Sequence, residues 1–220
     1  MSTLIDVSHA IEDGTVTYPG LPAPIVCDFL SREASKEQYA EGTSFHIGRI
    51  DMVANTGTYV DAPFHRFEDG KDLAELPLTS IADLPGIVVA SDEMAIGPEA
   101  FAGVELRNRA VLVKTGWDSH WGEPEYLNGH PFLTEAAANH LLDAGVALVG
   151  IDSLNIDDTR GGSRPVHTLL LGAEVPIVEH LCNLDALPET GFRFHAAPVK
   201  VRAFGTFPVR AYAVVDAETG

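Results

Sequence analysis

The sequence is short of cysteine and of positive charge, and both shortages exclude whole classes of protein. Cys27 and Cys182 are the only cysteines in 220 residues, too few for the disulfide framework of a small secreted protein. We expect both to be small buried side chains. Lysine and arginine number 14 against 32 aspartate and glutamate residues, a formal net charge of -18. A chain this acidic repels phosphate backbones and anionic lipid, so we expect neither nucleic acid nor membrane partners.

Long apolar runs are also missing. No stretch approaches the roughly 18 uncharged apolar residues that a membrane span requires, although 45% of the residues are apolar. The opening residues 1–6 have neither a basic start nor a long apolar core, so we expect no secretory signal and a cytoplasmic location. A length of 220 residues fits a single domain, 1–220, with enough apolar residues for a sizeable core.

Short apolar runs between turn residues predict a mixed fold in which strands outnumber helices. Thr134 is typical of a helix N-cap and Gly145 of a helix C-cap, so we expect a helix between them. About ten strands against about three or four short helices indicate a mixed, strand-rich α/β class. The predicted strands include 4–7, 25–30, 44–54, 86–90, 111–114, 146–151, 192–203 and 209–215, and the predicted helices include 98–102 and 136–144.

The segment 55–65, NTGTYVDAPFH, compresses turn residues and potential ligands into a short stretch. Gly57 permits a sharp turn, and Pro63 keeps the backbone extended just before His65. Asp61 offers carboxylate oxygens to a metal or a proton, and the imidazole of His65 can accept or donate a proton. The same residue types also make ordinary turns, so this segment alone leaves a structural turn and a functional loop both open.

A second stretch, 167–179, places His167 and Glu179 twelve positions apart around an apolar run. Together the two stretches resemble the cyclase family, which includes bacterial arylformamidases (kynurenine formamidases) and isatin hydrolases. That family carries a His-x-Gly-Thr-His-x-Asp-x-Pro-x-His loop and a later His and Glu at this spacing. The resemblance implies a swivelling β/β/α architecture, and it covers nearly the whole chain. Further family-like segments are DVSH at 6–9, YPG at 18–20, TGW at 115–117, GIDS at 150–153 and NLDAL at 183–187.

The resemblance assigns roles to individual residues. It implies that Asp61 and Glu179 are carboxylate ligands shared by two metals and that His167 is a ligand of the second metal. It implies that His65 is the proton donor and acceptor. Tyr18 matches by position an aromatic residue that lines the substrate pocket in the family, although arylformamidases usually carry Trp there.

The sequence departs from the family pattern at two positions. The first two histidines of the loop, ligands of the first metal, are Asn55 and Tyr59 here. An amide oxygen is a weak ligand and a neutral phenol a weaker one, so a first metal would bind poorly. The remaining set of Asp61, His167 and Glu179 suits one divalent ion, Zn, Mn or Mg. A polar pocket without any metal is the alternative.

A single metal with His65 as general base and then acid predicts hydrolysis of an amide, cyclic amide or lactone. Tyr59 would donate a hydrogen bond to the developing oxyanion, and Tyr18 and Asn55 would contact the substrate. The family's substrates, N-formyl aromatic amines and cyclic amides, imply an arylformamidase-like hydrolase. The alternative is a metal-free cyclase or isomerase, or a small-molecule binding protein with a degenerate metal site.

Four further features near the site are not part of the proposed ligand or catalytic set. The aromatic segment 118–131 either contacts substrate or caps the core. Because family members assemble, we expect a homodimer or homotetramer in which this segment covers its own or a neighbour's pocket. We expect Asp157 and Asp158 to be solvated. His180 follows Glu179 but should point from the opposite strand face, which argues against a ligand role.

Overall fold

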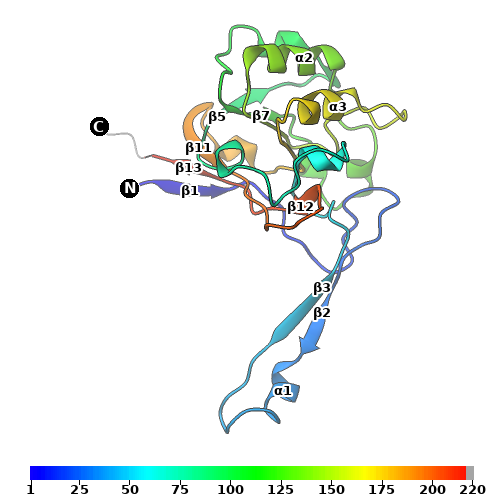
Figure 1. Cartoon of the computed structure of the whole chain (residues 1–220), viewed down its shortest axis with the longest axis vertical. Coiled ribbons are helices and arrows are strands. Elements are labelled where there is room, and N and C mark those ends of the chain that lie inside the picture. Colours follow the sequence, from blue (N-terminus) through cyan, green and yellow to red (C-terminus); the bar gives the residue numbers. More distant parts are fainter. Residues whose placement is uncertain (217–220) are drawn as a thin grey trace.

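A computed structural model of the chain describes residues 1–216, and its main element is a nine-stranded sheet (Figure 1). The strand order is β1-β13-β11-β5-β7-β9-β10-β4-β12. The mixed, strand-rich α/β class predicted from the sequence is confirmed. The strands of this sheet are β1 (Thr3–Asp6), β4 (Tyr59–Asp61), β5 (Leu84–Ala90), β7 (Ala110–Lys114), β9 (Leu148–Ile151), β10 (Ile177–Glu179), β11 (Thr190–His195), β12 (Thr206–Pro208) and β13 (Tyr212–Val215).

The centre of the sheet is parallel and its flanks are antiparallel. Strands β5, β7, β9 and β10 run parallel, whereas β11, β13 and β1 on one side and β4 and β12 on the other are antiparallel. Parallel neighbours need a long crossover, which α2 (Glu135–Ala144) supplies between β7 and β9 and α3 (Pro165–Gly172) between β9 and β10. The antiparallel β4 and β12 extend the sheet beyond β10.

Two apolar cores lie on opposite faces of the sheet. Val111 and Val113 belong to one core and Ala110 and Leu112 to the other, because successive side chains of a strand point to opposite faces. All four are fully buried, as expected for a central parallel strand covered on both sides. Helices α2 and α3 lie together over the Val111 face (Figure 1).

Helix α2 has the predicted ends, but other elements differ from prediction. The Thr134 side chain accepts a hydrogen bond from the Ala137 N–H at 3.2 Å, and Gly145 has φ +76°. Helix α3 was not predicted, because its apolar residues form no one-sided stripe. The strand predicted at 192–203 ends at His195, and Ala203 has φ +54°, which a strand cannot accommodate.

The remaining elements are 3₁₀ turns and one short ladder. The helix predicted at 98–102 is a 3₁₀ turn. The 3₁₀ turns are Pro63–His65, Leu78–Ser80, Pro98–Phe101, Trp117–His120, Pro124–Leu127 and Leu184–Ala186, and a two-stranded ladder joins β6 (Ala95–Ile96) to β8 (Phe132–Leu133). Within residues 1–216, no helix is both long enough and apolar enough to cross a membrane.

A hairpin of β2 (Ile25–Leu30) and β3 (Ile47–Asp51), with the single-turn helix α1 (Arg32–Ser35) near its tip, projects from the body (Figure 1). We call residues 25–51 the arm. The strand predicted at 44–54 is thus shorter, at Ile47–Asp51. Cys27 is exposed on β2 and Cys182 is partly exposed, so the prediction that both are buried is wrong. The arm stands away from the rest of the chain, which leaves Cys27 uncovered.

Candidate active site

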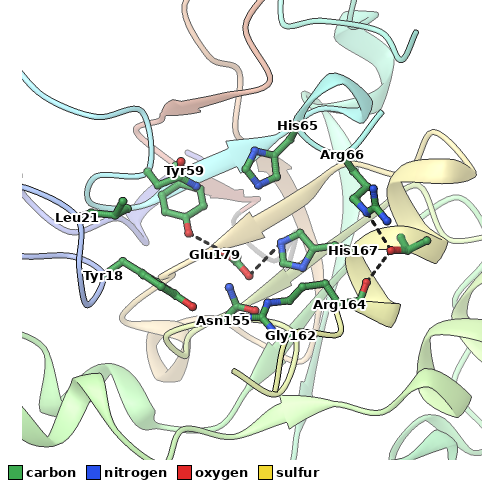
Figure 2. A pocket seen from close by; sticks show the side chains of 12 residues that line it. Tyr18, Leu21, Tyr59, His65, Arg66, Asn155, Gly162, Arg164, His167 and Glu179 are labelled. Carbon is green, nitrogen blue, oxygen red and sulfur yellow. Dashed lines mark hydrogen bonds and ion pairs between the residues drawn. The ribbon is translucent and has the colours of Figure 1, made fainter. Parts of the chain in front are cut away.

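A cavity of about 420 Å³ opens between the segment after β1, strand β4 and helix α3. The structure brings all the predicted site residues to this cavity. Asp61 is fully buried beneath the surface of the cavity and does not line it. Figure 2 shows Tyr18, Tyr59, His65, His167 and Glu179 converging on the cavity from different elements. The predicted residues that line it are Tyr18, Asn55, Tyr59, His65, His167 and Glu179.

The register of three strands places the polar groups at the base of the cavity. Tyr59 of β4 lies directly opposite Glu179 of β10. Asp61, two residues further along β4, lies opposite Thr206 of β12. Tyr59 and Asp61 point to the same face because side chains of a strand repeat every second residue. Gly57 has φ +65° and makes the turn that leads into β4, as its position in the sequence predicts.

Thr206 fixes the orientation of His65. The Thr206 hydroxyl donates to Oδ1 of Asp61, and its oxygen lies 2.8 Å from Nδ1 of His65. Because the hydroxyl has only one proton, Nδ1 of His65 must be the donor in the second bond. Nε2 of a neutral His65 is then a free base. Gly205 permits this contact, since a Cβ there would lie 2.3 Å from the His65 backbone nitrogen.

His167 is held by Asp157 in the same manner. Nδ1 of His167 lies 2.7 Å from Oδ2 of Asp157, and that carboxylate also accepts the backbone N–H groups of Val166 and His167. Because Asp157 accepts the proton of Nδ1, Nε2 of His167 is the ring nitrogen that remains for a ligand in the cavity. Asp157 is fully buried, so the prediction that it is solvated is wrong.

The groups around Nε2 of His167 fit a cation. Oδ2 of Asp61 lies 3.7 Å from this nitrogen, is buried, and has no hydrogen-bond partner within residues 1–216. Asp61, His65 and His167 each offer a ligand atom, and these atoms lie within 4.8 Å of one another. Two imidazoles and a carboxylate are ordinary ligands of a divalent transition metal. A bound cation would also satisfy the buried carboxylate oxygen of Asp61, which has no partner within residues 1–216.

The electrostatics of the site also favour a bound positive charge. Burial alone would lower the pKa of His167, but the charge of Glu179, the bond to Asp157 and the nearby Asp61 raise it to about 10. The cluster therefore favours a positive charge at this point, which either a proton or a metal ion supplies. Burial opposes the negative charge on Asp61, but His65, His167 and Thr206 hold the pKa of its carboxyl below the usual value.

Glu179 is engaged differently from the other predicted ligands. Its Oε1 accepts the Ile156 N–H at 2.7 Å, and its Oε2 accepts the Tyr59 hydroxyl at 2.6 Å. Oε1 also lies 3.6 Å from Nε2 of His167. The cluster of Asp61, His65 and His167 thus contains His65 in the place where the resemblance implies Glu179. Burial and the charges of Glu179 and Asp61 raise the pKa of Tyr59 well above its usual value, so the phenol keeps its proton.

A chain of hydrogen bonds leads away from Glu179 into the core. The Tyr59 hydroxyl gives its proton to Glu179, so its oxygen accepts from Nε2 of His180 at 3.3 Å. Nδ1 of His180 then accepts the Tyr126 hydroxyl at 2.8 Å. Burial lowers the pKa of His180 to about 3. His180 thus lies behind Tyr59, outside the cation cluster. Trp121 packs edge-on against both His180 and Tyr126, so this part of segment 118–131 caps the core.

Several site residues were not predicted from the sequence. Asp157 and Thr206 orient the two histidines, and Arg66, Asn155 and Arg164 line the cavity. Asp157 precedes a helix that the sequence did not reveal, and Thr206 reaches the site through strand pairing. Arg66 carried a signal, since it directly follows His65 in the candidate loop.

Comparisons with known proteins agree with this description. Residues 5–158 match the sequence model of the Cyclase family, described as "Putative cyclase". The chain is 28% identical over 213 residues to a kynurenine formamidase from Geobacillus thermodenitrificans, covering 96% of this chain and 97% of that protein.

Solved structures share the fold. Isatin hydrolase A from Labrenzia aggregata, bound to benzyl benzoate, superposes with a TM-score of 0.84 at 25% identity, covering 98% of this chain and 94% of that one. A potential metal-dependent hydrolase with cyclase activity superposes with a TM-score of 0.80 at 27% identity, covering 99% of this chain and all of that one. The predicted cyclase-like architecture is therefore confirmed.

Proposed function

The chain belongs to the cyclase family, and from this premise we propose that it hydrolyses a C–N bond other than a peptide bond in a small amide. The substrates that suit the site are N-formyl aromatic amines and cyclic amides, the classes indicated by the names of its formamidase and isatin hydrolase relatives. The observation that carries the proposal is the cluster of Asp61, His65 and His167 at the base of a cavity large enough for a small aromatic molecule.

We propose that the site holds one divalent ion, Zn, Mn or Mg. Asp61 and His167 would bind it, with Glu179 as a further ligand, because its Oε1 lies 3.6 Å from Nε2 of His167; Nε2 of His65 would then stay free for proton transfer. A bound ion would supply a Lewis acid that polarises the amide carbonyl. The unpartnered Oδ2 of Asp61 supports this assignment, because a buried carboxylate oxygen without a donor is costly unless a cation satisfies it.

The protein's own groups move the protons. Nε2 of His65 accepts a proton from the water that attacks the carbonyl carbon, and Thr206 and Asp61 stabilise the resulting imidazolium through Nδ1. The C–N bond then breaks, and His65 returns the proton to the departing amine nitrogen. A formamide thus yields formate and an amine, and a cyclic amide yields an open-chain amino acid. Tyr18 and Leu21 provide an aromatic and an apolar wall for the ring of the substrate.

The proposal is tested with purified protein and two substrate classes. Formanilide hydrolysis is followed by release of the aromatic amine, and isatin hydrolysis by loss of its absorbance. We expect turnover of at least one class that disappears with a chelator and returns when Zn, Mn or Mg is added back. His65→Ala serves as the inactive control. Absence of turnover with both classes under every metal condition would contradict the proposal.

We also propose that the protein is a homodimer or homotetramer held together through the arm. Half of the large apolar side chains exposed within residues 1–216 lie on the arm, although it is a small part of the chain. Phe29 is 74% exposed and Ile50 56% exposed. An apolar patch of this kind on a projecting hairpin is typical of a protein interface.

Sedimentation at micromolar concentration tests the assembly. The double variant Phe29→Ser with Ile50→Ser should shift the protein to monomer, whereas Leu78→Ser, at a site 69% exposed away from the arm, should not. A strict monomer in the unmodified protein would remove the idea. A cytoplasmic location, and the lack of nucleic acid and membrane partners, remain predictions from composition.

A further inference from the structure

Two arginines, Arg66 and Arg164, flank His167 on the α3 side of the cavity. Arg66 follows His65 at the end of a 3₁₀ turn, and Arg164 directly precedes α3. Figure 2 shows the two side chains on opposite sides of the His167 ring. Both line the cavity in a chain whose acidic residues outnumber its basic residues by 32 to 14.

Neither arginine has a carboxylate partner. Within residues 1–216, no Asp or Glu oxygen lies within 4.0 Å of a guanidinium nitrogen of Arg66 or Arg164. The acidic residue nearest to Arg164 in sequence, Asp158, is paired with Arg160, which binds both of its oxygens at 2.9 and 2.8 Å. The two cavity arginines therefore keep their positive charge available to a ligand.

Their side chains are nevertheless held in place. Nε of Arg66 donates to the Thr168 hydroxyl at 3.1 Å, and that hydroxyl donates to the Arg164 carbonyl at 2.7 Å. The Arg66 guanidinium also packs over the Phe67 ring, 5.3 Å from its centroid. Both terminal nitrogens of Arg66 have no hydrogen-bond partner in the part of the chain that the structure describes. A guanidinium fixed at Nε and free at its end is preorganised for bidentate recognition of a carboxylate.

Arg164 is anchored through one nitrogen only. Its Nη1 donates to the backbone carbonyls of Asp158, Gly161 and Ser163, which fixes the segment before α3. No hydrogen bond to its Nε or Nη2 forms within residues 1–216, so these donors stay available. Because Arg164 is half-buried, its charge is screened less by solvent than that of an exposed arginine.

We propose that Arg66 and Arg164 form an anion subsite and that the natural substrate of the hydrolase carries a carboxylate in addition to the scissile amide. The inference rests on the proposed hydrolase function for the reaction, but not for the binding of the anion. At the base of the cavity, Asp61 and Glu179 face Nε2 of His167 at 3.7 and 3.6 Å. On the α3 side of the cavity, Arg66 and Arg164 add two positive charges that have no carboxylate partner within residues 1–216, and these charges favour an anionic substrate over its neutral analogue.

Binding is measured first, because it does not require turnover. 2-Aminobenzoate and 2-aminobenzamide are fluorescent, similar in shape and differ in charge. We expect the protein as purified to bind the anion roughly 10- to 100-fold more tightly than the amide, the range of a hydrogen-bonded charge pair. The preference should fall to near unity in Arg66→Gln and recover in part in Arg66→Lys. Arg107→Gln removes an equal charge at an exposed site against Gly145 and should leave the preference unchanged.

Turnover is measured second, with N-formyl-2-aminobenzoate and its methyl ester. Arg66→Gln should lower kcat/KM for the acid, mainly through KM, by roughly tenfold more than it lowers kcat/KM for the ester. Hydrolysis of both compounds at equal rates, without a binding preference, would overturn the anion subsite while the hydrolase function stands. A binding preference that persists in Arg66→Gln and in Arg164→Gln would also overturn it, because the carboxylate would then bind at the cation cluster. Failure of all hydrolysis with an Arg66-dependent preference would support the subsite and contradict the hydrolase function.

Discussion

The Tyr59 hydroxyl donates a 2.6 Å hydrogen bond to Oε2 of Glu179, at a position where the cyclase pattern has a metal-ligating histidine. In the family pattern this carboxylate would bind the first metal; here the Tyr59 phenol donates a hydrogen bond to its oxygen instead. Oε1 of the same carboxylate accepts the Ile156 N–H at 2.7 Å, so both oxygens are satisfied without an ion. This pairing explains how Glu179 is tolerated in full burial.

Tyr59→Phe should remove this support. Glu179 would keep a buried oxygen without its donor, and a hydrogen bond to a charged group contributes about 1.5–3 kcal/mol. We expect a lower melting temperature and roughly a tenfold loss of kcat, larger than any change in KM. Tyr39→Phe, on the exposed arm, is the control. If Tyr59→Phe kept wild-type stability and turnover, the hydrogen bond would have no role in the site.

Restoring the family's first two loop histidines should restore a metal position. The double variant Asn55→His with Tyr59→His offers two imidazoles beside Glu179, which are the ligands the cyclase pattern uses. Elemental analysis after dialysis should show at most about one ion per chain in the wild type and a content closer to two in the variant. Two tightly bound ions in the wild type would show that Asn55 and Tyr59 do not impair the first position.

Asp157→Asn should weaken metal binding although it replaces none of the proposed metal ligands. The substitution removes the negative charge that orients His167 through Nδ1, and such outer partners contribute roughly 10- to 100-fold to metal affinity. Competition with a chromophoric chelator measures the change. Asp158→Asn is the matched control, because Asp158 pairs with exposed Arg160 on the surface. Equal affinity in both variants would contradict the role of Asp157.

His9 should make the protein less stable in mild acid. Burial lowers the pKa of His9 to about 4, and its ring stacks on Trp121 with centroids 3.9 Å apart. Between that value and the usual 6.5, the unfolded chain binds a proton that the folded chain does not. Unfolding free energy should therefore fall as pH is lowered through this window, by up to about 1.4 kcal/mol per pH unit.

Urea unfolding at pH 8, 6 and 5 measures the effect. His9→Phe keeps an aromatic ring against Trp121 but cannot be protonated, so its midpoint should fall less with pH than that of the wild type. His46→Ala, at an exposed position on the arm, should behave like the wild type. Identical pH dependence in all three proteins would show that His9 does not titrate differently on unfolding.

The sequence predicted those features that depend on neighbouring residues. Thr134 and Gly145 mark the ends of α2 because caps are local, and the loop around Asp61 and His65 is recognisable because its pattern is contiguous. The prediction did not extend to contacts made across the sheet. Thr206 reaches Asp61 from 145 residues away, through the pairing of β12 with β4. Helix α3 was missed because burial on several sides removes the polar stripe that periodicity requires.

His65 gives the most direct test of the mechanism, because its role does not depend on how many metals bind. As proton acceptor and donor it should contribute roughly 10²- to 10⁴-fold, so His65→Ala should depress kcat by that order and His65→Gln should not rescue it. Circular dichroism should show an intact fold, since the ring lies at the cavity surface. His46→Ala is the control for loss of an imidazole.

A Thr206 variant tests the orientation of the His65 ring while the ring itself is kept. Thr206→Val keeps the shape but removes the hydroxyl that accepts from Nδ1, so either tautomer becomes available and Nε2 is no longer held as the base. We expect a smaller loss of kcat than in His65→Ala, a pH profile displaced from that of the wild type, and recovery in Thr206→Ser. If His65→Ala retained full activity on an authentic substrate, the proton transfer would have to come from another group, and Thr206→Val should then be silent as well.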